Sequence, residues 1–171
     1  MSTMIVLRLV HIGGGIFWVG ALLFIAGFLL PALRDTGPAG GGVMRNLTEV
    51  RHLHIYLLTT SWLTILSGAT LAWRDVGPLG MQWFERGPGV VYGACALLAL
   101  VAVAIGLSVN APTAKHLSAL AASVQAAGGP PSPEQQAQLG RLQARLAGAT
   151  RFAAVILVLA GADMAVARYV G

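Results

Sequence analysis

Titratable side chains inside long apolar segments are the residues of this sequence most able to do chemistry. His11 and Asp163 each lie within such a segment, and His54 lies near the edge of another. Ionisable groups are costly in hydrocarbon and are candidates for functional sites, although each can also pair or reach the interface. Imidazole binds haem iron or copper and exchanges protons near neutral pH. These residues therefore predict a metal or proton-transfer site.

The first predicted cluster lies near one membrane boundary. Arg8 and His11 are three residues apart and share a helix face. At 1.5 Å per residue, His11 lies roughly 9 Å below the boundary, and Asp163 falls at about the same level of another helix. Arg8, His11 and Asp163 are therefore expected to meet. The alternative is that Asp163 pairs with Arg8 or His11 only to tie the first helix to the last.

A second group, Arg51, His52 and His54, lies near the opposite boundary. On a helix, His52 and His54 would point about 160° apart, so they cannot form a bidentate metal pair. One is expected to face the bundle and the other the headgroups. His11 and His54 differ in depth by roughly 15 Å, which opposes a haem held between them. A five-coordinate haem on His11, a non-histidine sixth ligand, or a site shared between protomers avoids this difficulty.

The composition requires a membrane to surround these residues. Of the 171 residues, 56% are hydrophobic and 10% are charged, with a mean hydropathy of +0.74. Ordinary soluble domains carry about 25% charged residues, so this chain is predicted to be an integral membrane protein. Its 11 Lys and Arg residues exceed its 6 Asp and Glu residues. The basic residues lie between apolar runs rather than on one polar face, which excludes a nucleic-acid partner.

Four apolar segments are long enough to cross a bilayer, which needs about 20 residues per helix. They cover about 4–30, 52–73, 89–110 and 152–170. Each must be helical, because lipid satisfies no backbone polar group. The prediction is an all-α integral membrane four-helix bundle that forms a single domain over residues 1–171.

Two long connections are expected to have structure of their own. Residues 37–42 predict a turn, and residues 43–51 an amphipathic segment continuous with the second span. Residues 113–150 predict a cytoplasmic helical hairpin with a break at 128–131, after which Ser132 caps the next helix. These connections also hold most of the basic residues: Arg34, Arg45, Arg51, Lys115, Arg141, Arg145 and Arg151. Since cytoplasmic loops are enriched in Lys and Arg, both termini are predicted to lie outside.

Small and aromatic residues on the spans add to the prediction. Gly13, Gly14 and Gly15 thin the first helix, which allows close helix packing or the approach of a flat cofactor. Trp18 and Trp62 fall near mid-depth, so both are expected to face the bundle interior.

Several residues carry a resemblance to a known superfamily. The first span reads His11-x6-Trp18-x-Gly20, and the second ends in Leu66-Ser67-Gly68-x3-Ala72. This pattern resembles the superfamily of small bacterial membrane proteins that includes CopD-like and HemJ-like proteins. The resemblance covers mainly residues 4–73. It implies about four helices in the bacterial cytoplasmic membrane, with His11 binding haem b or a copper ion.

The sequence also departs from both branches of that superfamily. HemJ-like enzymes carry an Asn-Glu-Val-Pro-like stretch and a membrane lysine, and neither is found here. CopD-like proteins usually have more helices, and this chain has no Met-x-Met copper face. Of the five methionines, only Met164 is well inside a span.

The leading functional prediction is a haem-b-binding membrane redox protein that transfers electrons. His11 would be the axial ligand, His54 or His52 would serve as a second ligand or second site, and Arg8 and Arg51 would bind propionates. One alternative is a non-catalytic accessory or assembly subunit, whose glycine-rich helix faces dock into a larger membrane complex or a homodimer. A second alternative is the handling of copper or another metal ion by His11 and Asp163.

Overall fold

A computed structural model describes residues 2–36, 38–85 and 87–169. The structure is 94% helical, and the described residues contain no strand, which confirms the all-α prediction. Gly37 and Arg86, from the predicted turn and from the connection between the second and third spans, lie outside the described residues. The same holds for the side chain of Arg168.

Four helical segments are long and apolar enough to cross a membrane: Thr3–Asp35, Leu53–Val76, Pro88–Ala126 and Pro133–Val166. The first comprises α1 (Ser2–Phe24), the π-helical turn η1 (Ile25–Leu29) and α2 (Leu30–Asp35). The second is α4 (Leu53–Val76), and the third comprises α5 (Pro88–Ile105), η4 (Gly106–Asn110) and α6 (Ala111–Ala126). The fourth is α7 (Pro133–Val166). Each of the four has more than the roughly 20 residues that crossing a bilayer requires.

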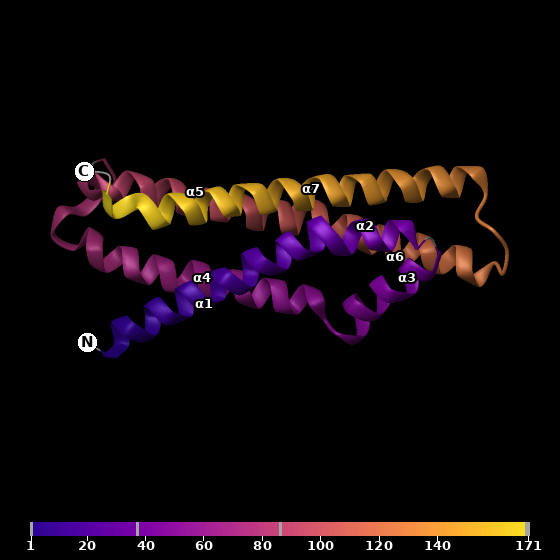
Figure 1. The fold of residues 1–171 in the computed structure, drawn as a ribbon, viewed down its shortest axis with the longest axis horizontal. Coiled ribbons are helices and arrows are strands. Elements are labelled where there is room, and N and C mark those ends of the chain that lie inside the picture. The colour runs from indigo at the N-terminus through magenta and orange to yellow at the C-terminus, as the bar shows by residue number, and fades with distance from the viewer. Residues whose placement is uncertain (1, 37, 86, 170–171) are drawn as a thin grey trace.

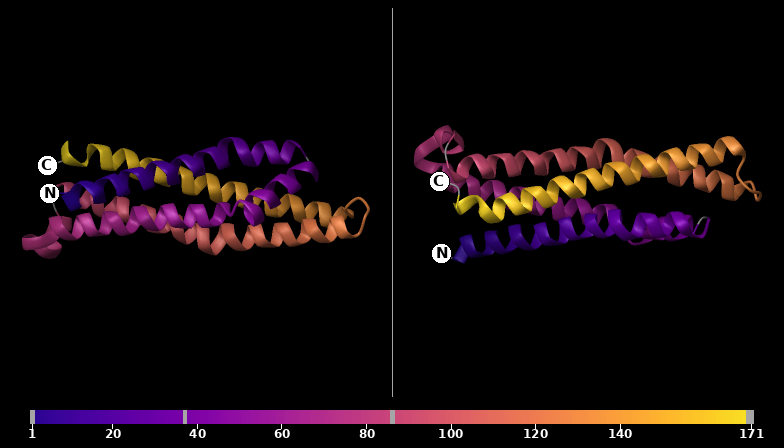
Figure 2. Two further views of the ribbon diagram at one scale, coloured as in Figure 1. Left: turned by 90° about the horizontal axis from the view of Figure 1, so that it is seen from below. Right: turned by 45° about the horizontal axis from the view of Figure 1, so that its top comes forward.

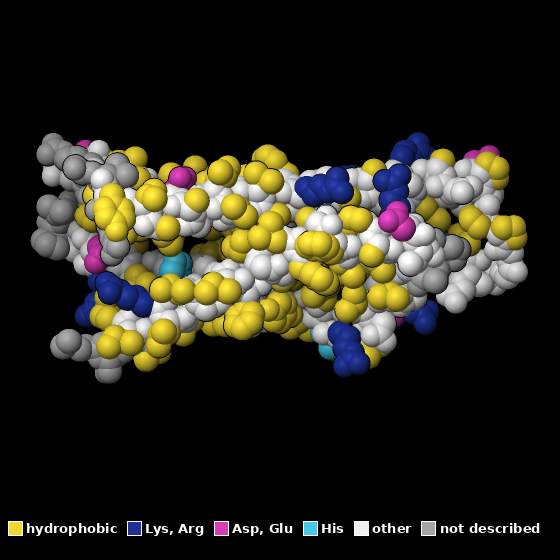
Figure 3. Space-filling view, in the orientation of Figure 1, with side chains coloured by type: hydrophobic (Ala, Val, Ile, Leu, Met, Phe, Trp, Pro, Cys, Tyr) yellow, Lys and Arg dark blue, Asp and Glu magenta, His cyan; other side chains and the backbone are white. Residues whose placement is uncertain are grey.

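The long helices associate as two pairs. Helix α1 packs mainly against α4, and α5 packs mainly against α7. Figures 1 and 2 show the two pairs side by side along the long axis, with both termini at one end and the α6–α7 turn at the other. Large apolar side chains such as Phe17, Phe28 and Leu97 are exposed, and apolar surface covers the middle of the molecule in Figure 3. This exposure matches helices surrounded by lipid.

Small residues and one tryptophan form the contact between the pairs. The core cluster includes Trp18, Leu22, Ala102, Ala153 and Leu157. Trp18 is only 5% exposed, as predicted from its depth. Small residues at such contacts let helix backbones approach closely in a membrane.

The prediction for Trp62 was wrong, because its side chain is 45% exposed. The interior face of α4 is instead formed by Thr60, Ser61 and Ser67, which are buried. Each of these hydroxyls donates to a carbonyl of its own helix. These small side chains can therefore line the interior with their hydrogen bonds satisfied by their own helix, while the larger indole of Trp62 faces outward.

The connection before α4 differs from the prediction. Helix α3 (Pro38–Arg45) begins where a turn was predicted, with proline at its first position. It continues as η2 (Asn46–Val50), but the helix stops there and does not run into α4. His52 has a left-handed backbone, with φ of 52°, which redirects the chain. A β-carbon at Gly40 would overlap the carbonyl oxygen of Leu33, so this glycine permits the close approach of α2 and α3.

The two remaining connections lie at opposite ends of the molecule. The first is a 3-10 segment, η3 (Gly77–Glu85), which leads from α4 toward α5, and the second joins α6 to α7. A further 3-10 segment, η5 (Ala167–Tyr169), follows α7. Helices α6 and α7 contact each other and are joined by residues 127–132. Ser132 forms the predicted capping box with Gln135 at the start of α7.

Candidate functional site

The imidazole of His11 lies between α1, α4 and α7. Its Nδ1 is 2.8 Å from the carbonyl oxygen of Thr64 on α4, and its Nε2 is 3.5 Å from Sδ of Met164 on α7. A carbonyl oxygen can only accept a hydrogen bond, so Nδ1 must carry the hydrogen. The ring is thereby oriented with Nε2 directed toward the thioether.

Two acceptors face each other in this arrangement. When the ring is neutral, Nε2 presents a lone pair, and the thioether sulfur has no hydrogen to donate. The contact becomes favourable when Nε2 is protonated or when both atoms bind a metal ion. Imidazole whose other nitrogen donates to a carbonyl is the usual form of a histidine ligand. His11 therefore has the orientation of a ligand, and Met164 lies where a second ligand would be.

Two glycines make the space in which the His11 ring lies. A β-carbon at Gly68 would be 2.6 Å from Cε1 of His11, and one at Gly14 would be 2.7 Å from Oγ1 of Thr64. Real β-carbons do not approach so closely, so residues larger than glycine would displace the ring or Thr64. The glycine at position 68 belongs to the stretch that carries the family resemblance.

The predicted cluster of Arg8, His11 and Asp163 does not form around an ion pair. Asp163 and Arg8 are exposed, and the only ion pair among the described residues joins Arg45 and Glu49 at 4.0 Å. His11 contacts Met164 instead of Asp163, its neighbour in sequence. Met164 could have been recognised as a candidate from the sequence, because it is the methionine deepest inside a span.

The second predicted group is arranged differently from the prediction. The rings of His52 and His54 lie edge to face with centroids 6.1 Å apart, so the expectation that they point apart was wrong. The reason is that α4 begins at Leu53, and the left-handed backbone of His52 turns its ring back toward His54. Both side chains are exposed, as is that of Arg51.

His11 and His54 are too far apart to bind one iron within this chain. His11 contacts the carbonyl of Thr64, which lies ten residues after His54 on the same helix. Ten residues of α-helix span about 15 Å, in agreement with the separation expected from the sequence. His54 belongs to a different feature of the molecule.

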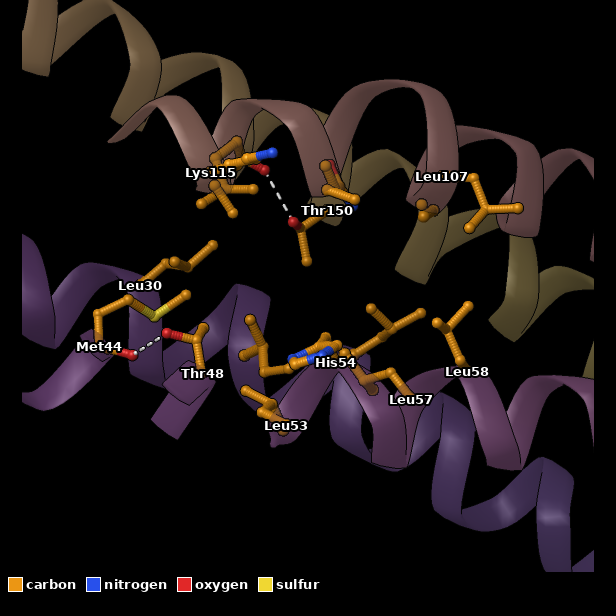
Figure 4. A pocket seen from close by; sticks show the side chains of 18 of the residues that line it. Leu30, Met44, Thr48, Leu53, His54, Leu57, Leu58, Leu107, Lys115 and Thr150 are labelled. Atoms are coloured by element: carbon orange, nitrogen blue, oxygen red, sulfur yellow. Dashed lines mark hydrogen bonds between the residues drawn. The ribbon is translucent and has the colours of Figure 1, made fainter. Parts of the chain in front are cut away.

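That feature is a partly open cavity of about 700 Å³, lined by the four long helical segments and by α3 and η2. Its walls are mainly apolar and include Trp18, Leu22, Leu57 and Leu107. Figure 4 shows His54 on the α4 wall, with Lys115 and Thr150 across the cavity on α6 and α7. Its volume falls in the range of small-molecule sites, roughly 300 to 1,000 Å³.

The described residues contain no group of three His, Cys, Asp or Glu side chains that could hold a metal ion. The donor set at His11 is therefore one imidazole and one thioether, a set that suits haem iron or monovalent copper. Comparisons with known proteins add no family to this chemistry. No protein-family model, no curated protein and no solved structure matches the chain.

Proposed function

We propose that this protein is a haem-b-binding membrane redox protein whose iron is held by His11, with Met164 as the sixth ligand. The observation that carries the proposal is the Nδ1 hydrogen bond to the Thr64 carbonyl, which leaves Nε2 directed at the Met164 sulfur. His54 lies too far from His11 along the helices to bind the same iron. Met164 would therefore serve as a non-histidine sixth ligand.

Histidine and methionine side chains are both known haem ligands. Nε2 and Sδ are 3.5 Å apart, so the two side chains would have to separate to hold an iron atom between them. Methionine has three rotatable side-chain bonds and adapts readily to such a change.

Each neighbouring residue has a role in this proposal. A bound haem b would supply one-electron transfer. The Thr64 carbonyl orients the His11 ring. Arg8 lies one turn nearer the helix end than His11, where its guanidinium can bind propionates at the membrane boundary. Arg51, His52 and His54 are too distant to bind the same group.

A monovalent copper ion is the second candidate. Nε2 and Sδ lie 3.5 Å apart on two helices that contact each other, so one ion could bind both. Imidazole and thioether are both suitable copper ligands. In this case the protein handles copper without a porphyrin.

Absorption spectra and metal analysis of the purified protein distinguish these proposals. Haem binding predicts a Soret band and sharpened bands after dithionite reduction in the wild type. His11→Ala should abolish them, and Met164→Leu should shift the reduced bands and lower the reduction potential. His116→Ala, on an exposed site far from the ligands, is the matched control. Colourless protein that binds one copper ion through His11 and Met164 would replace haem with copper, and binding of neither would refute both.

We also propose the bacterial cytoplasmic membrane as the location, with both termini outside. The four apolar helices support a multi-pass membrane protein, and the termini lie at the same end of the molecule. Arg141 and Arg145 lie in the first half of α7, toward the α6–α7 turn and away from the termini, and Arg151 lies near the middle of this helix. Their number there supports a cytoplasmic α6–α7 hairpin.

A further inference from the structure

The cavity of about 700 Å³ lies away from the His11 site and has an amphipathic lining. Its walls come from all four long segments, from Trp18 and Leu22 on α1 to Ala153 on α7. Leucine, alanine and valine side chains form most of the surface. Such walls suit an apolar ring or chain that enters from the bilayer.

Three hydroxyl groups of the lining already donate to backbone carbonyls. Thr48 donates to the Met44 carbonyl at 3.0 Å, Ser61 to that of Leu58 at 2.9 Å, and Thr150 to that of Leu146 at 2.7 Å. Each hydroxyl oxygen retains a lone pair for a ligand. These three groups can therefore accept hydrogen bonds from a bound molecule but not donate to one.

Asn110 adds a further acceptor. It lines the cavity from η4, and among the described residues its Oδ1 is the buried side-chain atom without a hydrogen-bond partner. An unmet buried acceptor costs free energy that a donor from a ligand would recover. These acceptors favour a ligand that carries O–H or N–H groups.

Three titratable side chains among the described residues line the cavity: Glu49 of η2, His54 of α4 and Lys115 of α6. Figure 4 shows His54 and Lys115 across the open space, and Glu49 also pairs with Arg45. Imidazole can donate to or accept from a hydroxyl, the ammonium group donates, and the carboxylate accepts. A ligand with polar groups at opposite edges of a ring can contact both walls.

From this lining we propose that the cavity binds a lipid quinol, that is, a hydroxylated aromatic ring with an apolar tail. Its hydroxyl groups donate to Asn110 and to the wall hydroxyls, and its tail lies along the apolar walls. Trp18 lines the cavity and follows His11 by seven residues, which is about 10 Å of helix. The assignment of the quinol as electron partner of the His11 centre rests on the proposed function, whereas quinol binding does not.

Native mass spectrometry of the detergent-purified full chain, titrated anaerobically with a decyl-substituted benzoquinol, tests the proposal. The wild type should bind one quinol. Asn110→Leu should weaken binding about three- to tenfold, the effect of one lost hydrogen bond. Gly106→Leu should abolish binding by filling the cavity, since no described atom lies within 4 Å of a β-carbon there. Gly148→Leu, which also meets no described atom within 4 Å and is not part of the lining, should bind as the wild type does.

Two further measurements make the result decisive. The same quinol with both hydroxyls methylated should bind at least tenfold more weakly, because it cannot donate. Equal binding of the methylated compound, or displacement of the quinol by a fatty acid or phospholipid, would overturn the proposal. His11→Ala should retain quinol binding even though it loses haem. A colourless wild type that still binds the quinol would therefore refute the redox centre alone. A wild type that shows the haem spectrum but does not bind the quinol would refute the cavity assignment alone.

Discussion

At the scale of residues, the chemistry of His11 depends on two neighbours that lie far away in sequence. The Thr64 carbonyl fixes the hydrogen on Nδ1, and Met164 places a soft donor opposite Nε2. Depth along the helices correctly indicated which level of α7 meets His11. Depth alone does not determine which residue of that level faces inward. Asp163 and Met164 differ by 100° around the helix, and only the packing of α7 against α1 selects Met164.

Gly68 gives the sharpest test of the space around His11. Gly68→Ala would place a methyl group 2.6 Å from Cε1 of the imidazole, so the ring must leave the Thr64 carbonyl. We expect loss of bound haem or copper comparable to that in His11→Ala. Overpacking should also lower the unfolding free energy by about 1 to 3 kcal/mol. Visible absorption, metal analysis and thermal unfolding in detergent measure these effects.

Gly13→Ala is the matched control for this substitution, because no described atom lies within 4 Å of the added β-carbon. It should keep the ligand content and stability of the wild type. If Gly68→Ala retained full ligand content while remaining folded, the described position of the His11 ring would be wrong.

At the scale of elements, hydropathy located the long helices because lipid forces every spanning backbone into a helix. The predicted segment 52–73 corresponds to the helix Leu53–Val76, and 89–110 lies within Pro88–Ala126. The break before α4 had no such signal. His52 adopts a left-handed backbone conformation, which changes the direction in which the neighbouring imidazoles point. Glycine or asparagine at this position would have indicated such a conformation, whereas histidine does not.

The start of α7 was predictable because its capping residues are local. Ser132 accepts a hydrogen bond from the backbone of Gln135 at 3.2 Å, and the Gln135 side chain accepts from the backbone of Ser132 at 2.9 Å. Ser132→Ala removes the first bond and should destabilise the first turn by about 0.5 to 2 kcal/mol. Hydrogen–deuterium exchange of residues 133–137 should become faster, with little change in residues 150–160.

Ser123→Ala serves as the control, since Ser123 is exposed and bonds only to the Leu120 carbonyl of its own helix. It should leave exchange at the start of α7 unchanged. Unaltered exchange in Ser132→Ala would show that packing of α6 on α7, and not the cap, holds this turn.

At the scale of the whole molecule, the two candidate sites lie at different levels along the helix pairs. The His11 site lies where α1 and α4 meet α7 in the half nearer the termini. The quinol cavity lies between the same pairs, nearer the α6–α7 hairpin. Trp18 separates the two regions and is buried among small residues. The packing around Trp18 would thus fix the position of a ligand ring in the cavity relative to a metal at His11.

The orientation in the membrane determines on which side each region opens, and labelling of single cysteines can measure it. Cys95→Ala provides the background, because Cys95 is buried and its thiol donates only to the Ala160 carbonyl at 3.2 Å. Gln82→Cys lies on η3 near the termini, and Gln143→Cys lies on the hairpin part of α7; both positions are exposed. With the termini outside, a membrane-impermeant maleimide should label Gln82→Cys in intact spheroplasts. It should label Gln143→Cys only after the membrane is permeabilised.

The reverse pattern would place the hairpin outside, against the distribution of its arginines. The quinol cavity would then open toward the outer face, and Arg8 would lie at the cytoplasmic boundary. Under the proposed function, propionates held by Arg8 would in that case face the cytoplasm, and an electron from a quinol in the cavity would move inward to His11 instead of outward. The labelling pattern therefore decides in which direction across the membrane the proposed pair of sites would carry an electron.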